Sequence, residues 1–130
     1  MIELSEAEVK NACEEYLQYA MNQGKLWFSR MNAGSFIAGQ GTPGERMIKG
    51  AGAGTADLIV IQAGSIQMFY RAISRGEPWP IAFVTFIECK STKGKTTKEQ
   101  DEFAEQARNQ HCRYEIVRSV DDLMEVLKRE

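Results

Sequence analysis

The sequence predicts an α/β domain in which a central mixed β-sheet is flanked by helices. Two apolar runs of strand length, at 57–62 and 81–90, are rich in Val, Ile and Phe, as buried strands are. Apolar residues also recur at helical spacing before Asn22, around Phe103 and near the C-terminus. Because 130 residues suffice for one core but not for two, we expect a single domain over residues 1–130.

The overall composition excludes several classes of protein. Hydrophobic residues make up 43% of the chain and charged residues 26%, and there is neither a membrane-spanning run nor a signal-peptide pattern. Three scattered cysteines, Cys13, Cys89 and Cys112, indicate a reducing compartment rather than a disulfide framework. A net charge of −2 disfavours a basic coat protein for nucleic acid, and the single histidine, His111, excludes His-rich metal centres.

The N-terminal segment carries the signals of an amphipathic helix. Ser5 and Glu8 have the spacing of a capping box, the pattern runs to about Asn22, and Gly24 follows as a terminator. The residues expected to face the core are Val9, Ala12, Cys13, Tyr16, Leu17 and Ala20. Glu6 stands at the start of that stripe, where an acid either simply suits a helix N-terminus or points to a functional site.

A predicted strand at Leu26–Met31 leads into a glycine-rich interval, residues 32–54. That interval is either a surface loop or a loop whose backbone approaches phosphates, with help from Arg46 and Lys49. A nucleotide-binding P-loop is excluded because no Walker motif is present. We expect a short strand near Arg46–Ile48 and disorder before it.

The interval between the two apolar runs predicts a hairpin and a loop. We expect the first strand to turn at Ala63–Ser65 and to pair with Ile66–Tyr70. Turn-forming residues in Ser74–Pro80 indicate a loop, in which Trp79 either packs over the sheet edge or stands exposed as a contact. A last strand is expected at Cys112–Arg118, followed by a helix.

The segment after Lys90 is rich in lysine and then becomes helical. Its lysines are Lys93, Lys95 and Lys98. They mark either a solvated loop or one that neutralises phosphates. Thr96 and Glu99 have capping-box spacing, and Gln100 lies on the apolar stripe of the helix that follows. Gln100 therefore either occupies a wet first turn or is aimed at a site.

Charged residues mark the ends of the two apolar strands. Asp57 opens the first, and Glu88 and Lys90 close the second. Side chains two apart on a strand share a face, so Glu88 and Lys90 project together while Cys89 points away. Charges in buried strands are almost never unpaired, and Asp57 joins the cluster if the strands are neighbours. A hard divalent cation would explain the two acids, since Mg²⁺ prefers oxygen ligands.

This pattern resembles the PD-(D/E)XK signature of the restriction-endonuclease-like nucleases, with Ala56 in place of the usual proline. More narrowly, the chain resembles the virus-type replication–repair nuclease domain, VRR-NUC. The further pieces that match are Glu6-x-x-Val9, the run Arg30-Met31-Asn32-Ala33-Gly34, the run Gly54-Thr55-Ala56-Asp57, and Gln100 after Lys90. Together these pieces span nearly the whole chain.

The resemblance implies a restriction-endonuclease-like core and a nuclease that depends on Mg²⁺ or Mn²⁺. Asp57 and Glu88 would hold one or two ions, with the backbone carbonyl of Cys89 as a further ligand. Glu6 would bind metal directly or through water. The catalytic set would be Glu6, Asp57, Glu88, Lys90 and Gln100, in which Lys90 orients the attacking water and Gln100 supports the same region.

The resemblance also implies a substrate and a setting. The substrate would be DNA of particular structure, such as junctions or flaps, processed in phage or mobile-element replication and repair in the cytoplasm of a bacterial or phage-infected host cell. We expect contacts to nucleic acid from Arg30, Arg46, Lys49, Lys93, Lys95 and Lys98. A homodimer would place two sites on two strands, and the apolar interval Ile66–Trp79 is its predicted interface. No membrane partner is expected.

Two other interpretations remain open at this stage. The first is a binding or assembly module that keeps the fold without the chemistry. The second is an unrelated small α/β domain in which Asp57 and a Glu88–Lys90 ion pair are merely structural. It predicts that Asp57 lies far from Glu88.

Overall fold

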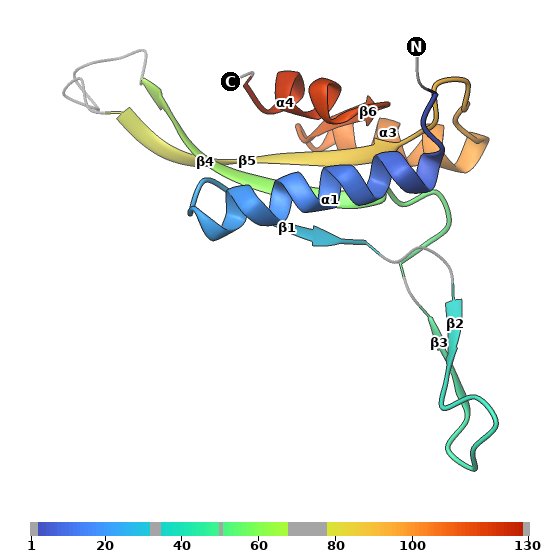
Figure 1. Ribbon diagram of the computed structural model, residues 1–130. Coiled ribbons are helices and arrows are strands. Elements are labelled where there is room, and N and C mark those ends of the chain that lie inside the picture. The colour runs from blue at the N-terminus through green and yellow to red at the C-terminus, as the bar shows by residue number, and fades with distance from the viewer. Residues whose placement is uncertain (1–2, 32–34, 50, 68–77, 129–130) are drawn as a thin grey trace.

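Helices cover both faces of a central β-sheet in the computed structural model of the chain (Figure 1). The structure describes residues 3–31, 35–49, 51–67 and 78–128. Its elements, in chain order, are α1 (Glu6–Asn22), β1 (Trp27–Arg30), β2 (Ser35–Ala38), β3 (Arg46–Lys49), β4 (Leu58–Gln67), β5 (Pro78–Cys89), α3 (Lys98–Asn109), β6 (Arg113–Val117) and α4 (Val120–Lys128). The α/β class predicted from the sequence is confirmed.

The central sheet has the strand order β1-β4-β5-β6. β4 pairs antiparallel with both β1 and β5, whereas β5 and β6 run parallel, so the sheet is mixed as predicted. A parallel pair needs a crossover connection, and α3 supplies it. β4 begins where β5 ends, with Leu58 opposite Ile87. The residues just before β4 and those at the end of β5 therefore meet at the same end of these two central strands.

Two apolar clusters lie on opposite faces of this sheet. Between the sheet and helices α1 and α4 are Val9, Cys13, Leu17, Leu58, Val60, Ile87, Cys89, Val117, Leu123 and Val126. Between the sheet and α3 are Ala56, Ala104 and Tyr114, packed with Phe86 and Phe103. Burying one large aliphatic side chain stabilises a fold by about 1.5–3 kcal/mol. Since Ile87 and Cys89 are fixed in the first cluster, Glu88 between them faces the α3 side.

Strands β2 and β3 form a hairpin that projects away from the sheet (Figure 1). They pair antiparallel from Ser35 opposite Lys49 to Ala38 opposite Arg46. The turn between them uses Gly39, which has a φ of 66°, a conformation that favours glycine. The predicted strand near Arg46–Ile48 is confirmed. The expectation of disorder before it is wrong for residues 35–45, because a paired strand and an ordered turn precede it.

The paired strands β4 and β5 extend beyond their neighbours as a two-stranded ribbon. Their pairing runs without interruption from Leu58 opposite Ile87 to Gln67 opposite Pro78. The predicted turn at Ala63–Ser65 is therefore wrong, and Pro78–Pro80 belongs to a strand rather than to a loop. Gly64 was misleading: the ring of Phe83 lies where a β-carbon would stand, so the glycine lets an aromatic ring cover the strand.

The predicted dimer interval is described only in part. Residues 68–77 of it, and most of the predicted hairpin partner Ile66–Tyr70, lie outside the described residues. Trp79 lies on β5 and is 49% exposed, so about half of its side chain is covered by the chain itself. In the part of the chain that the structure describes, no helix has both the length and the apolar character needed to cross a membrane.

Candidate active site

The carboxylate of Asp57 is tied to the end of β5. Asp57 directly precedes β4, whose first residue lies opposite Ile87. Its Oδ2 atom accepts a hydrogen bond from the backbone N–H of Cys89 at 2.9 Å. Asp57 therefore meets the strand segment that carries Glu88 and Lys90. The interpretation as an unrelated domain, which required Asp57 to lie far from Glu88, is wrong.

Glu88 is a buried carboxylate with too little positive charge around it. Its side chain is 3% exposed, and its Oε2 atom accepts a hydrogen bond from Gln100 Nε2 at 3.2 Å. The Oε1 atom is buried and finds no hydrogen-bond partner among the described residues, which is rare for a buried polar atom. Burial and the neighbouring Asp57 carboxyl raise the pKa of Glu88 to about 8, and the Lys90 ammonium opposes this only in part.

Gln100 reaches Glu88 because a helix cap holds it. The N-cap of α3 is Thr97, whose hydroxyl accepts the backbone N–H of Gln100, while Gln100 Oε1 accepts the N–H of Thr97 at 2.9 Å. The amide oxygen is thus occupied by the cap, and the amide nitrogen is directed to Glu88. The predicted capping box at Thr96 and Glu99 is wrong by one residue. With the box at Thr97 and Gln100, the Gln100 side chain both completes the cap and donates a hydrogen bond to Glu88.

Gly54 brings the segment before Asp57 against the start of α3. Its φ of 82° is in the left-handed region, and a β-carbon there would collide with the backbone carbonyl of Glu99. Only glycine fits both the conformation and the close approach. The contact fixes the Asp57 segment relative to the helix turn that carries Gln100.

Lys90 is an ammonium shared between two acids. Its side chain is 8% exposed, and its Nζ atom lies 3.8 Å from Glu88 Oε2 and 3.4 Å from Glu6 Oε1. The contact with Glu6 brings the start of α1 to the cluster. Glu6 itself remains 54% exposed, so its carboxylate is at the open side of the site.

Lys10 is a member of this cluster that was not predicted. Its Nζ atom lies 3.3 Å from Asp57 Oδ1. The signal was present in the sequence as Glu6, Lys10 and Glu14, which recur every four residues along one helix face. Each of the three pairs with a residue from outside α1, so α1 presents a row of charges beside its apolar stripe.

These residues follow the expected order along the chain and meet at one end of the central strands. Both features agree with the family expected from the sequence. A family model described as VRR-NUC domain matches residues 8–121. The chain belongs to the VRR-NUC family. This is a family of nucleases, and its match includes every residue of the predicted set except Glu6, which lies two residues before it. No curated protein and no solved structure matches the chain.

The acids of this VRR-NUC domain suit a divalent cation. Mg²⁺ and Mn²⁺ take oxygen ligands and are often held by only one or two carboxylates. A cation beside Asp57 and Glu88 would favour the charged form of Glu88 against the burial and the Asp57 charge that raise its pKa, and would give its unpartnered oxygen a ligand. Within the described residues, no set of three or more His, Cys, Asp or Glu side chains gathers for a metal. Backbone carbonyls or water would therefore have to complete the coordination.

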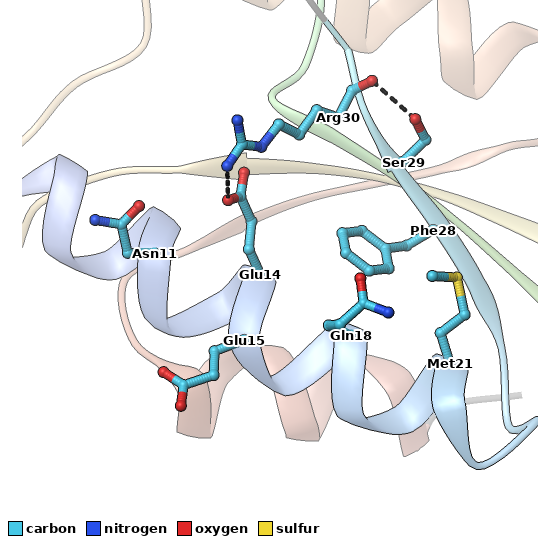
Figure 2. A pocket seen from close by; sticks show the side chains of 8 residues that line it. All are labelled: Asn11, Glu14, Glu15, Gln18, Met21, Phe28, Ser29 and Arg30. Atoms are coloured by element: carbon cyan, nitrogen blue, oxygen red, sulfur yellow. Dashed lines mark hydrogen bonds and ion pairs between the residues drawn. The ribbon is translucent and has the colours of Figure 1, made fainter.

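Arg30, predicted to contact nucleic acid, is held by Glu14. Its Nη2 atom lies 2.7 Å from Glu14 Oε2, and the pair stands at a hollow of about 400 Å³ between α1 and β1 (Figure 2). The side chain of Arg30 is 67% exposed, so part of the guanidinium remains accessible. On α1 the hollow is lined from Asn11, the residue after Lys10, to Met21.

The other predicted nucleic-acid contacts are spread over two regions. Arg46 is exposed on the projecting β2–β3 hairpin, whereas the side chain of Lys49 lies outside the described residues. Lys93 pairs with Glu3 at 3.7 Å, and Lys95 and Lys98 are exposed near it in the chain.

The lysine-bearing loop after Lys90 is anchored by Arg118. Its Nη1 atom donates hydrogen bonds to the carbonyls of Ser91 at 2.6 Å and Gly94 at 2.8 Å, with a longer contact to Thr92. These contacts tie three carbonyls of the loop to one side chain. Arg118 therefore helps to fix the conformation of the loop.

Proposed function

We propose that this VRR-NUC domain hydrolyses DNA phosphodiester bonds with Mg²⁺ or Mn²⁺ held by Asp57 and Glu88. One observation carries the proposal: the carboxylates of Asp57 and Glu88 lie with the ammonium of Lys90 at one end of the central strands, and one oxygen of the buried Glu88 has no hydrogen-bond partner among the described residues. An arrangement that leaves a pKa near 8 on a carboxyl is costly for a merely structural ion pair. It is expected where a cation completes the site.

The residues would divide the work as follows. The bound metal would polarise the phosphate and acidify water. Asp57 and Glu88 would hold that ion, with the Cys89 carbonyl and Glu6 as further ligands, Glu6 directly or through water. Lys90 would orient the attacking water and offset charge that develops on the phosphate oxygens. Gln100 would keep Glu88 in place through the hydrogen bond between their side chains.

Cleavage of labelled DNA tests this proposal. The wild-type protein should cut DNA only when Mg²⁺ or Mn²⁺ is present, and the variants Asp57→Asn and Glu88→Gln should lose cleavage by about 10²-fold or more. Glu105→Gln is a matched control, because Glu105 is exposed on α3 away from the cluster. The proposal is wrong if either site variant cleaves like the wild type.

The finer proposal concerns which DNA is cut. We expect structure-selective endonuclease activity on junctions or flaps, with contacts from Arg30 beside its hollow and from the lysines after Lys90. A homodimer would present two such sites to the two strands of a branched molecule. A panel of branched and linear DNAs of equal length separates selective from general cleavage.

The alternative is an idle module of the same fold that binds nucleic acid without cutting it. It predicts DNA binding that is indifferent to Mn²⁺ and to Glu88→Gln. If the protein is the proposed enzyme, Mn²⁺ should change the binding of DNA and should also lead to its cleavage.

A further inference from the structure

We propose that Lys10 is a built-in counter-ion of the metal site, which competes with the divalent cation for Asp57 and then binds a substrate phosphate. The inference rests on the proposed function and adds a residue to it. Its basis is the contact between Lys10 Nζ and Asp57 Oδ1 at 3.3 Å.

The two oxygens of Asp57 are occupied differently. Oδ2 accepts the backbone N–H of Cys89, a contact that strand β5 keeps in place. Oδ1 faces the ammonium of Lys10, which is carried on a flexible stem. Only the second contact can be given up without moving the backbone. Oδ1 is therefore the atom of Asp57 at which a cation and Lys10 compete.

The exposure of the two lysines separates their roles. Lys90 is 8% exposed and lies between Glu6 and Glu88, so it stays inside the cluster. Lys10 is 38% exposed, so its ammonium can turn toward solvent at little cost. It is the lysine suited to leave Asp57 when a stronger cation arrives.

The charges around the site show what the exchange achieves. Without metal, three carboxyl groups, those of Glu6, Asp57 and Glu88, face the ammonium groups of Lys10 and Lys90, so the acids exceed the cations by one. Loading a divalent cation while Lys10 stays in place would bring like charges together. Moving Lys10 outward relieves this repulsion and places an ammonium at the mouth of the site, where a DNA phosphate carries the complementary charge.

Two consequences follow for the free protein. The presence of Lys10 weakens binding of the metal alone, because its ammonium must first be displaced. DNA restores metal affinity, because a phosphate then takes the ammonium that the metal releases. Metal loading and DNA binding are thereby coupled through one side chain.

Calorimetry with Mn²⁺ in the absence of DNA tests the first consequence. Lys10→Met should bind Mn²⁺ severalfold more tightly than the wild type, since only the wild type must first break the partly exposed contact between Lys10 and Asp57. Lys10→Arg keeps the charge and should stay near wild type. Lys128→Met is the matched control, because Lys128 is exposed on α4 with Glu125 as its partner.

A purely structural role for Lys10 predicts the opposite sign. Losing a stabilising contact to Asp57 would loosen the site and weaken Mn²⁺ binding. Unchanged or weaker Mn²⁺ binding by a folded Lys10→Met protein therefore overturns the inference. Should that variant fail to fold, Lys10→Gln is measured in its place, with the same expected sign.

Steady-state cleavage tests the second consequence. In Lys10→Met, KM for DNA should rise severalfold, and Lys10→Arg should restore it. At saturating DNA the Mn²⁺ concentration for half-maximal rate should stay near that of the wild type, because a phosphate then holds the wild-type ammonium away from Asp57. An unaltered KM contradicts the phosphate contact. The two proposals fail separately. A wild-type protein that cuts no DNA refutes the proposed nuclease activity. The Mn²⁺ affinities of the wild type and Lys10→Met, measured without DNA, still decide whether Lys10 competes for Asp57.

Discussion

Replacing Glu88 by Gln should stabilise the metal-free protein, and the gain should depend on pH. In the folded protein the pKa of Glu88 is about 8, against an ordinary value of 4.5, because burial and the Asp57 carboxyl disfavour the charged form. Between pH 4.5 and pH 8, folding is therefore accompanied by the uptake of a proton by Glu88. The stability that goes with the protonated form is present below pH 4.5 and is lost as pH rises through 8.

The magnitude follows from the interval between the two pKa values. At pH 7 the proton uptake costs on the order of 3 kcal/mol, because each pH unit above 4.5 contributes about 1.4 kcal/mol. Glu88→Gln has the same shape and needs no proton. At pH 7 the free energy of unfolding of the variant should exceed that of the wild type by on the order of 3 kcal/mol, or ~10 °C in Tm. At pH 4.5 the two proteins should be almost equally stable.

Chemical denaturation in EDTA at pH 4.5, 5.5, 7 and 8.5 measures this difference. The control Glu105→Gln should show a small difference that is the same at every pH. Adding Mn²⁺ should stabilise the wild type and leave Glu88→Gln unchanged. A gain that does not grow with pH, or a wild type that is the more stable protein at pH 7 without metal, refutes the reasoning.

Three further predictions concern the neighbours of Glu88 and the assembly. Lys90→Ala should lose cleavage but keep Mn²⁺ binding in calorimetry, since an ammonium cannot ligate a cation; a folded variant without metal binding would contradict its role. Gly54→Ala should cost at least ~1 kcal/mol in denaturation, because the added carbon enters left-handed backbone and meets the carbonyl of Glu99; equal stability would contradict the close approach. Light scattering at micromolar concentration should show a dimer that Trp79→Glu dissociates, and a wild-type monomer rules this out.

The grouping of Asp57, Glu88 and Lys90 could be predicted because it depends on short, regular spacing. Glu88 and Lys90 are two residues apart on a strand, so their common face follows from the alternation of side chains. Asp57 could be added because it opens the neighbouring strand. The family match spans residues 8–121, so Glu6 alone of the predicted catalytic residues precedes it.

The errors arose where tertiary contacts override local signals. Gly64 indicated a turn, but the ring of Phe83 from the adjacent strand occupies the space that the glycine leaves. Thr96 and Thr97 offer equal capping spacing, and the choice of Thr97 follows from the cap that Gln100 completes. Lys10 was missed because its partner, Asp57, is 47 residues away along the chain, beyond what a local pattern can specify.

The central claim is that Asp57 and Glu88 together form one divalent-metal site. Calorimetric titration of Mn²⁺ into the wild type, Asp57→Asn, Glu88→Gln and the double variant tests it most directly. The account predicts that either single change abolishes tight Mn²⁺ binding in a protein that remains folded, and that the double variant is no worse than either single one. Mn²⁺ binding of wild-type affinity in either single variant would contradict the account.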